Sequence, residues 1–187
     1  GYQPDPDTAV HTFCHALPET WHQMGVILAA TDALNWYAKL IGTEAARLTG
    51  ELGELQAPGK TLFLPYLGGE RTPLNSASVR GAFTGLEHAT DRKAATRAVL
   101  EGVTYAIRDS RDALATTGTR LESLLAVGGG SRSDYWLKLI ASALDCPVQL
   151  PVAGDFGGAF GAARLALMAA THAGAEIATL PPIARVI

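Results

Sequence analysis

The chain has 187 residues, of which 48% are hydrophobic and 18% charged, a composition typical of a soluble globular domain with one sizeable core. Its 15 Lys and Arg residues face 18 Asp and Glu residues, and the formal charge of -3 provides no basic field for a nucleic acid. The apolar stretches are too short, or too interrupted by charge, to span a bilayer as a helix. We therefore expect a soluble protein that binds neither nucleic acid nor a membrane.

The two cysteines, Cys14 and Cys146, are far apart, and the chain has no secretory signal pattern. Both observations favour reduced thiols in a cytoplasmic protein. The first residues, Gly1 to Pro6, are polar and turn-forming and contain no methionine. The sequence reads as if entered midway through a protein, so we expect residues 1 to 187 to form a single domain of a longer chain.

The first half of the sequence predicts short strands and amphipathic helices. Residues 21 to 28 have the pattern of a buried strand, and Thr31 with Asp32 is expected to cap a helix that Gly42 ends. The apolar face of that helix predicts part of the core. Further along we expect a second helix, a short strand and a polar loop, over residues 43 to 52, 61 to 64 and 65 to 82.

The second half predicts a long helix from Thr90 or Asp91, because small and apolar residues recur at helical spacing. Its charged residues are expected to form a solvated face: Arg92, Lys93, Arg97, Arg108 and Arg111. Four further elements follow: a buried strand at 121 to 127, a helix capped by Ser131 or Ser133, a strand at 147 to 150, and a helix from 154–158 to 173. Since strands alternate with helices, the sequence predicts an α/β domain with helices on a sheet.

Three consecutive glycines, Gly128 to Gly130, connect a predicted strand to a capped helix. Without Cβ atoms they would let a planar ligand lie against the backbone, and the helix N-terminus next to them would favour a nucleotide. A tight turn also uses glycine for its positive φ angles, so a purely structural turn explains the run equally well. The pattern alone leaves both interpretations open.

Other phosphate and metal motifs are missing or incomplete. The sequence holds no G-x-x-x-x-G-K-[ST] loop, and Ser133 breaks the dinucleotide fingerprint G-x-G-x-x-G, which disfavours a Rossmann-type oxidoreductase. His11, Cys14 and His15 form a compact group, but no second group completes a metal site. We therefore expect no metal ligands in this chain.

Four segments, in order and at matching spacing, resemble FGGY carbohydrate kinases. Thr61 to Pro73 (TLFLPYLGGERTP) and Gly81 to Tyr105, with GAFTGL and RAVLEGV, are similar to the two signature blocks of the family. Val10 to Pro18 (VHTFCHALP) and Gly154 to Ala166 (GDFGGAFGAARLA) narrow the resemblance to bacterial xylulokinases. The likeness covers roughly residues 8 to 170.

The resemblance implies a ribonuclease-H-like, actin-like ATPase domain, the second of two domains between which ATP and a sugar meet. It implies that the adenosine loop is formed by four consecutive residues, Gly128, Gly129, Gly130 and Ser131. Asp134 is then expected near the adenine. Thr31 and Asn35, one helical turn apart, are expected to face the ribose and phosphates.

The resemblance and the positions in the chain also lead to expectations for three further residues. Asp155 is similar to an acidic residue that precedes a small-residue helix beneath the pocket, and we expect it to be structural. Glu70 and Arg71 lie in a loop after a strand, where a surface ion pair at the rim of the cleft is one expectation, but their role stays open.

The catalytic residues are expected outside this chain. In the family, the base Asp and both phosphate turns lie upstream of the segment that this sequence resembles, and phosphoryl transfer also requires Mg²⁺. None of the aspartates here has the sequence context of such a base, so we assign no catalytic residue: Asp32, Asp91, Asp109, Asp112, Asp134, Asp145 and Asp155.

The resemblance implies that the full-length parent uses ATP to convert D-xylulose to D-xylulose 5-phosphate. This chain alone is expected to bind ATP or ADP weakly, through adenosine, and to transfer no phosphoryl group. The sugar is chosen mainly by the other domain, so a kinase of the same family for ribulose, gluconate or glycerol stays an alternative. A nucleotide-binding module without activity is another. We also expect exposed apolar surface that the other domain, or a second copy in a homodimer, would cover.

Overall fold

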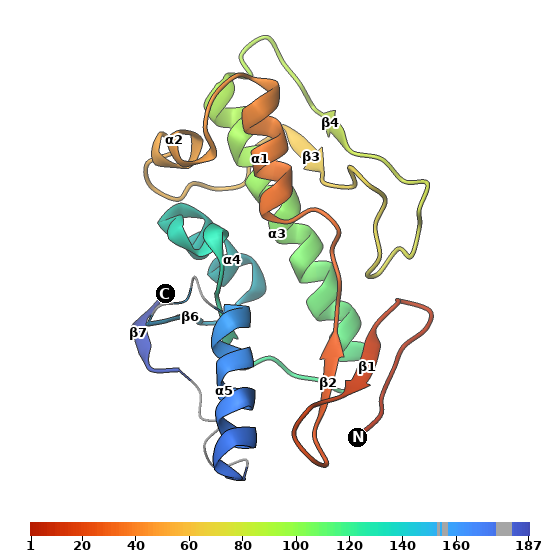
Figure 1. Ribbon diagram of the computed structural model, residues 1–187. Coiled ribbons are helices and arrows are strands. Elements are labelled where there is room, and N and C mark those ends of the chain that lie inside the picture. Colours follow the sequence, from red (N-terminus) through yellow and green to blue (C-terminus); the bar gives the residue numbers. More distant parts are fainter. Residues whose placement is uncertain (153, 155–156, 175–180) are drawn as a thin grey trace.

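The computed structural model describes residues 1–152, 154, 157–174 and 181–187 (Figure 1). Its elements, in chain order, are β1 (His11–Cys14), β2 (Trp21–Met24), α1 (Thr31–Leu40), α2 (Ala45–Gly50), β3 (Leu62–Leu64), β4 (Ala82–Thr84), α3 (Arg92–Thr116), β5 (Leu124–Leu125), the 3-10 turn η1 (Gly129–Arg132), α4 (Asp134–Leu144), β6 (Val148–Pro151), α5 (Gly157–Thr171) and β7 (Ile183–Val186). Among these described elements, no helix has the length and apolar character needed to cross a membrane.

Helix α3 runs through the middle of the molecule, and α1, α2, α4 and β3 all contact it (Figure 1). Asp91 caps its N-terminus as the sequence predicted: the carboxylate accepts the backbone N–H of Ala94 at 2.8 Å. The predicted apolar face is buried, with Ala98, Val99 and Val103 almost without solvent exposure. The periodicity of the sequence therefore identified the central helix and the face that it buries.

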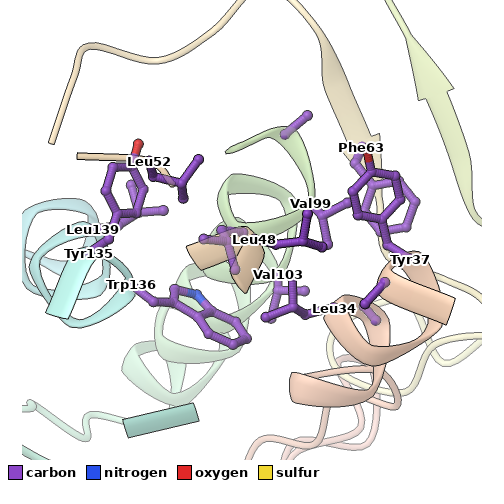
Figure 2. Close-up of a cluster of buried hydrophobic side chains, with 14 of the residues drawn as sticks. Leu34, Tyr37, Leu48, Leu52, Phe63, Val99, Val103, Tyr135, Trp136 and Leu139 are labelled. Carbon is purple, nitrogen blue, oxygen red and sulfur yellow. The ribbon is translucent and has the colours of Figure 1, made fainter. Parts of the chain in front are cut away.

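The main core lies where α1, α2, α4 and β3 meet α3. Figure 2 shows Leu34 and Tyr37 of α1, Leu48 of α2 and Trp136 of α4 pointing toward Val99 and Val103 of α3. Burying side chains of this size stabilises the fold by about 1.5–3 kcal/mol each. This cluster fixes the relative positions of the three helices that line the candidate site.

A buried hydrogen bond joins α4 to α3. The indole N–H of Trp136 donates to the hydroxyl of Thr104 at 3.1 Å, and that hydroxyl donates to the carbonyl of Leu100 at 2.7 Å. Trp136 is 3% exposed and Thr104 is 0% exposed, so neither group can turn to water instead. The bond therefore sets the depth at which α4 lies on α3.

Replacing Thr104 with valine should destabilise the fold by about 1–3 kcal/mol, because it leaves the buried indole N–H of Trp136 without an acceptor. Thr104→Ser keeps the hydroxyl and loses one methyl group, which should cost about 1 kcal/mol or less. Urea unfolding measures both losses, and hydrogen exchange of the indole N–H should accelerate in the valine variant alone. Equal behaviour of the two variants would show that the hydrogen bond is unimportant.

The strands of the described residues form three small sheets, and here the structure departs from the sequence analysis. β1 pairs with β2, β3 pairs with β4, and the third sheet has the order β5-β6-β7. The prediction of a buried strand from Leu121 to Val127 is wrong, because β5 is short and Leu125 and Val127 are 40% and 50% exposed. β5 pairs with β6 along one edge and with no described strand along the other, so it is an edge strand of its sheet.

Several further expectations are corrected. Ala30, and not Thr31 or Asp32, occupies the N-cap of α1, and no side chain caps that helix. β2 ends at Met24 rather than continuing to residue 28, and it is not a buried strand, since Trp21 and Met24 are 43% and 41% exposed. Ser133 is the cap of α4, since its hydroxyl accepts the N–H of Trp136. β7 was not predicted at all, because a four-residue strand is defined by its pairing with β6 more than by its own sequence.

One part of the predicted solvated face of α3 is largely covered. The side chain of Arg97 is 16% exposed, and its guanidinium lies 3.2 Å from the carboxylate of Glu101, which is 2% exposed. Glu101 also accepts the backbone N–H of Gly59, and Arg97 donates to the side chain of Gln56. The pair anchors the loop between α2 and β3, and this tertiary role is invisible in the helical pattern.

Candidate functional site

A cavity of about 600 Å³ opens between α1, α2 and the start of α4; we call it the glycine-loop cavity. Its size is within the range of about 300 to 1,000 Å³ that is common for small-molecule sites. Its lining comes from α1 (Thr31, Leu34, Asn35), from α2 and the turn after it (Ala45, Ala46, Thr49, Gly50, Gly53), and from η1 and α4 (Gly129, Gly130, Arg132, Ser133, Asp134, Tyr135, Trp136).

The three consecutive glycines differ in what requires them. Gly128 has a φ of 85°, a left-handed conformation that favours glycine. A Cβ atom on Gly130 would lie 2.8 Å from the hydroxyl of Thr31 and 3.4 Å from the ring of Trp136, so only glycine allows this close approach. A Cβ atom on Gly129 would meet nothing within 4 Å. Gly129 therefore leaves open space on the cavity side, whereas Gly128 is explained by its positive φ and Gly130 by the close approach of Thr31 and Trp136.

Thr31 and Asn35 lie on the cavity wall, as the sequence analysis expected of residues one helical turn apart. Because the backbone of Ala30 begins α1 without a side-chain cap, the hydroxyl of Thr31 is not used for capping and lies beside Gly130. Asn35 is exposed. Both side chains can offer hydrogen bonds to a polar ligand in the cavity.

Asp134 is the first residue of α4 and lines the same cavity. Its two carboxylate oxygens accept hydrogen bonds from the guanidinium of Arg185 on β7, at 2.5 and 3.2 Å. These bonds lower the pKa of the Asp134 carboxyl and raise the pKa of the Arg185 guanidinium. Asp134 is therefore ionised near neutral pH, but its charge is compensated.

Two of the residues assigned to the adenosine loop, Gly128 and Ser131, do not line the glycine-loop cavity. The hydroxyl of Ser131 donates to the carbonyl of Gly128 at 2.6 Å and so closes the glycine turn. Ser131 lines an adjacent cavity of about 300 Å³, which it shares with Thr31 and Gly130. Gly128 lines neither cavity, and its N–H donates to the carbonyl of Gly154. The structure therefore brings five of the seven predicted residues together: Thr31, Asn35, Gly129, Gly130 and Asp134.

Sequence reasoning missed the wall formed by α2 and the contribution of Arg185. The signal that could have revealed the wall is the run of small residues in a short helix and the turn after it: Ala45, Ala46, Gly50 and Gly53. Glu51 ties this wall to α3, because its carboxylate accepts from Arg47 at 3.0 Å and from Arg92 at 2.6 Å. Arg185 has no comparable signal, because only the pairing of β7 with β6 brings it near α4.

The expectation of a surface ion pair between Glu70 and Arg71 is wrong. Glu70 is 3% exposed, and one of its carboxylate oxygens accepts the backbone N–H groups of Leu28 at 3.0 Å and Arg71 at 2.7 Å. It thus ties the segment before α1 to the loop after β3. Asp155 lies outside the described residues. Among those described, no group of three or more His, Cys, Asp and Glu side chains could hold a metal ion.

Comparison with known proteins identifies the family. Residues 2–170 match the FGGY family of carbohydrate kinases, C-terminal domain, so the chain belongs to this family. Xylulose kinase from Escherichia coli (strain K12) is 42% identical over 98% of this chain and 38% of its own length.

Two solved structures are similar as well. A xyloylose kinase from Brucella ovis is 63% identical with a TM-score of 0.94, over 100% of this chain and 39% of that one. Xylulose kinase from Rhodospirillum rubrum is 30% identical with a TM-score of 0.77, over 98% of this chain and 38% of that one.

These findings confirm the resemblance and the fold class that the sequence indicated. The neighbours are FGGY sugar kinases, whose domains have the ribonuclease-H-like fold of actin-like ATPases. This chain spans about 38% of the length of the E. coli relative. What the comparisons show for this chain is therefore its family and its place in the C-terminal domain.

Proposed function

We propose that this chain is the nucleotide-binding domain of an ATP-dependent sugar kinase whose substrate is D-xylulose, with D-xylulose 5-phosphate as product. The glycine-loop cavity is the observation behind the proposal, because Gly129 leaves open space near the N-terminus of α4 in a cavity that two hydrogen-bonding side chains of α1 also line. The identity of 42% to the E. coli xylulose kinase supports the choice of sugar. The other FGGY substrates, ribulose, gluconate and glycerol, stay alternatives because the sugar site lies outside this domain.

Within the cavity, the open space beside Gly129 suits the flat adenine ring, and Thr31 and Asn35 are placed for the ribose and phosphates. Asp134 can accept a hydrogen bond from an amino group of the base. These groups lie on α1 and α4, and both helices pack into the main core. The ligand would therefore bind to a rigid site.

The proton acceptor for the sugar hydroxyl does not come from this cavity. Asp134 is the one carboxylate among the described residues that line it, and its lowered pKa and its ion pair with Arg185 make it a poor base. We propose that the base and the ligands of a divalent metal, expected to be Mg²⁺, belong to the part of the protein outside this chain. When bound, the metal would neutralise charge on the phosphates.

The test compares the full-length protein and this 187-residue chain in a coupled ADP-release assay with D-xylulose, D-ribulose, gluconate and glycerol. The full-length protein should phosphorylate D-xylulose with the highest kcat/KM. The isolated chain should give no turnover above background, since loss of a positioned base alone costs about 10²- to 10⁴-fold. Turnover by the isolated chain would mean that one of its own aspartates is the base.

Calorimetry with ATP, ADP and adenosine separates the remaining possibilities. The isolated chain should bind all three with similar and low affinity, because the phosphate turns and the metal ligands are proposed to lie outside it. A preference for another sugar in the full-length assay would reassign the substrate within the family. Nucleotide binding without turnover on any sugar would favour a binding module without activity.

A further inference from the structure

Arg185 reaches the candidate site from a strand that the sequence analysis did not predict. It lies opposite Leu150 in the pairing of β6 with β7. Two residues later, the backbone N–H and carbonyl of Ile187 form hydrogen bonds of 2.9 Å with the carbonyl and N–H of Val148. Because α4 contacts β6, a long side chain on β7 can reach the first turn of α4. There the guanidinium donates to both carboxylate oxygens of Asp134.

The charge of Asp134 is unfavourable for the proposed ligand unless it is compensated. ATP carries several negative charges, and in 0.1 M salt like charges repel each other appreciably only within the Debye length of about 10 Å. The bidentate guanidinium offsets the carboxylate charge, in a pair whose side chains are 48% and 60% exposed. Each oxygen still has a lone pair for a donor on the ligand, so the pair does not remove Asp134 from the site.

We propose that Arg185 is a positioning residue of the nucleotide site, which neutralises the Asp134 carboxylate so that the cavity accepts an anionic adenine nucleotide. This inference rests on the proposed function, because it takes the ligand to be ATP or ADP. Arg185 acts through Asp134 rather than by touching the phosphates. Its effect is therefore expected to depend on the charge of the ligand and on the presence of the Asp134 carboxylate.

The experiment measures ATP and adenosine binding to the full-length protein by calorimetry at low salt. Arg185→Gln should weaken ATP binding about three- to tenfold and change adenosine binding by less than about twofold, because adenosine is uncharged. Arg185→Lys keeps the charge without the two parallel N–H bonds and should show an intermediate affinity. The double variant Arg185→Gln/Asp134→Asn should return close to the wild-type ATP affinity, because no unpaired carboxylate remains.

Arg108→Gln is the matched control, since Arg108 forms an exposed ion pair with Asp112 on α3 and does not line the cavity. It should leave both affinities unchanged. Equal losses for ATP and adenosine, or a double variant as weak as Arg185→Gln, would assign Arg185 a merely structural role in β7 and overturn the inference. Unchanged ATP binding in Arg185→Gln would also overturn it. A wild-type protein that binds neither ligand would overturn the proposed function together with this inference.

Discussion

Gly102→Ala is expected to unfold the chain or to destabilise it by about 3 kcal/mol or more, the upper range for overpacking a core. A Cβ atom at this position in α3 would lie 2.1 Å from the carbonyl oxygen of Phe63 and 3.0 Å from its carbonyl carbon. These are backbone atoms of β3, which cannot move without separating the strand from the helix. The two backbones are therefore in contact because residue 102 has no side chain.

Gly158→Ala is the control for this prediction, because a Cβ atom there meets nothing within 4 Å in α5. Alanine has the higher helix propensity, so the control should be neutral or stabilising by up to about 1 kcal/mol. Denaturant unfolding followed by circular dichroism measures both. If Gly102→Ala also stayed within about 0.5 kcal/mol of the wild type, the close approach of α3 and β3 would be wrong.

Gly129→Val is expected to abolish binding of ATP, ADP and adenosine alike while the domain stays folded. The valine side chain would occupy the open space on the cavity side of the glycine turn, where the proposal places the base. Among the described residues no atom lies within 4 Å of the added Cβ, and Gly129 is not one of those with a positive φ, so the fold should tolerate the change. Calorimetry and thermal unfolding separate the two effects.

The matched substitution is Gly158→Val, the same change in open space on α5, away from the cavity. It should leave all three affinities unaltered. Wild-type affinities in Gly129→Val would remove the glycine turn from the nucleotide site. A loss confined to ATP and ADP would mean that the turn contacts phosphates and not adenosine.

Local signals were enough to predict the helices that carry the site. The cap at Asp91, the cap at Ser133 and the apolar face of α3 depend on residues within a few positions of one another. A helix closes its hydrogen bonds within its own sequence, so these interactions can be read without knowing the fold. The segments that resemble the FGGY kinases can also be recognised without knowing the fold. They indicated the family that the comparisons then confirmed.

Patterns in the residues thus predicted the family, the alternation of helices and strands, and five residues that the structure gathers around one cavity. The exposure of β5, the existence of β7 and the burial of Glu70 and Glu101 follow from the folded arrangement instead. Strand pairing and the burial of a charge depend on partners distant in the chain, so no local pattern predicts them. The pairing of Arg185 with Asp134, 51 positions earlier, is set in the same way by β7 lying on β6.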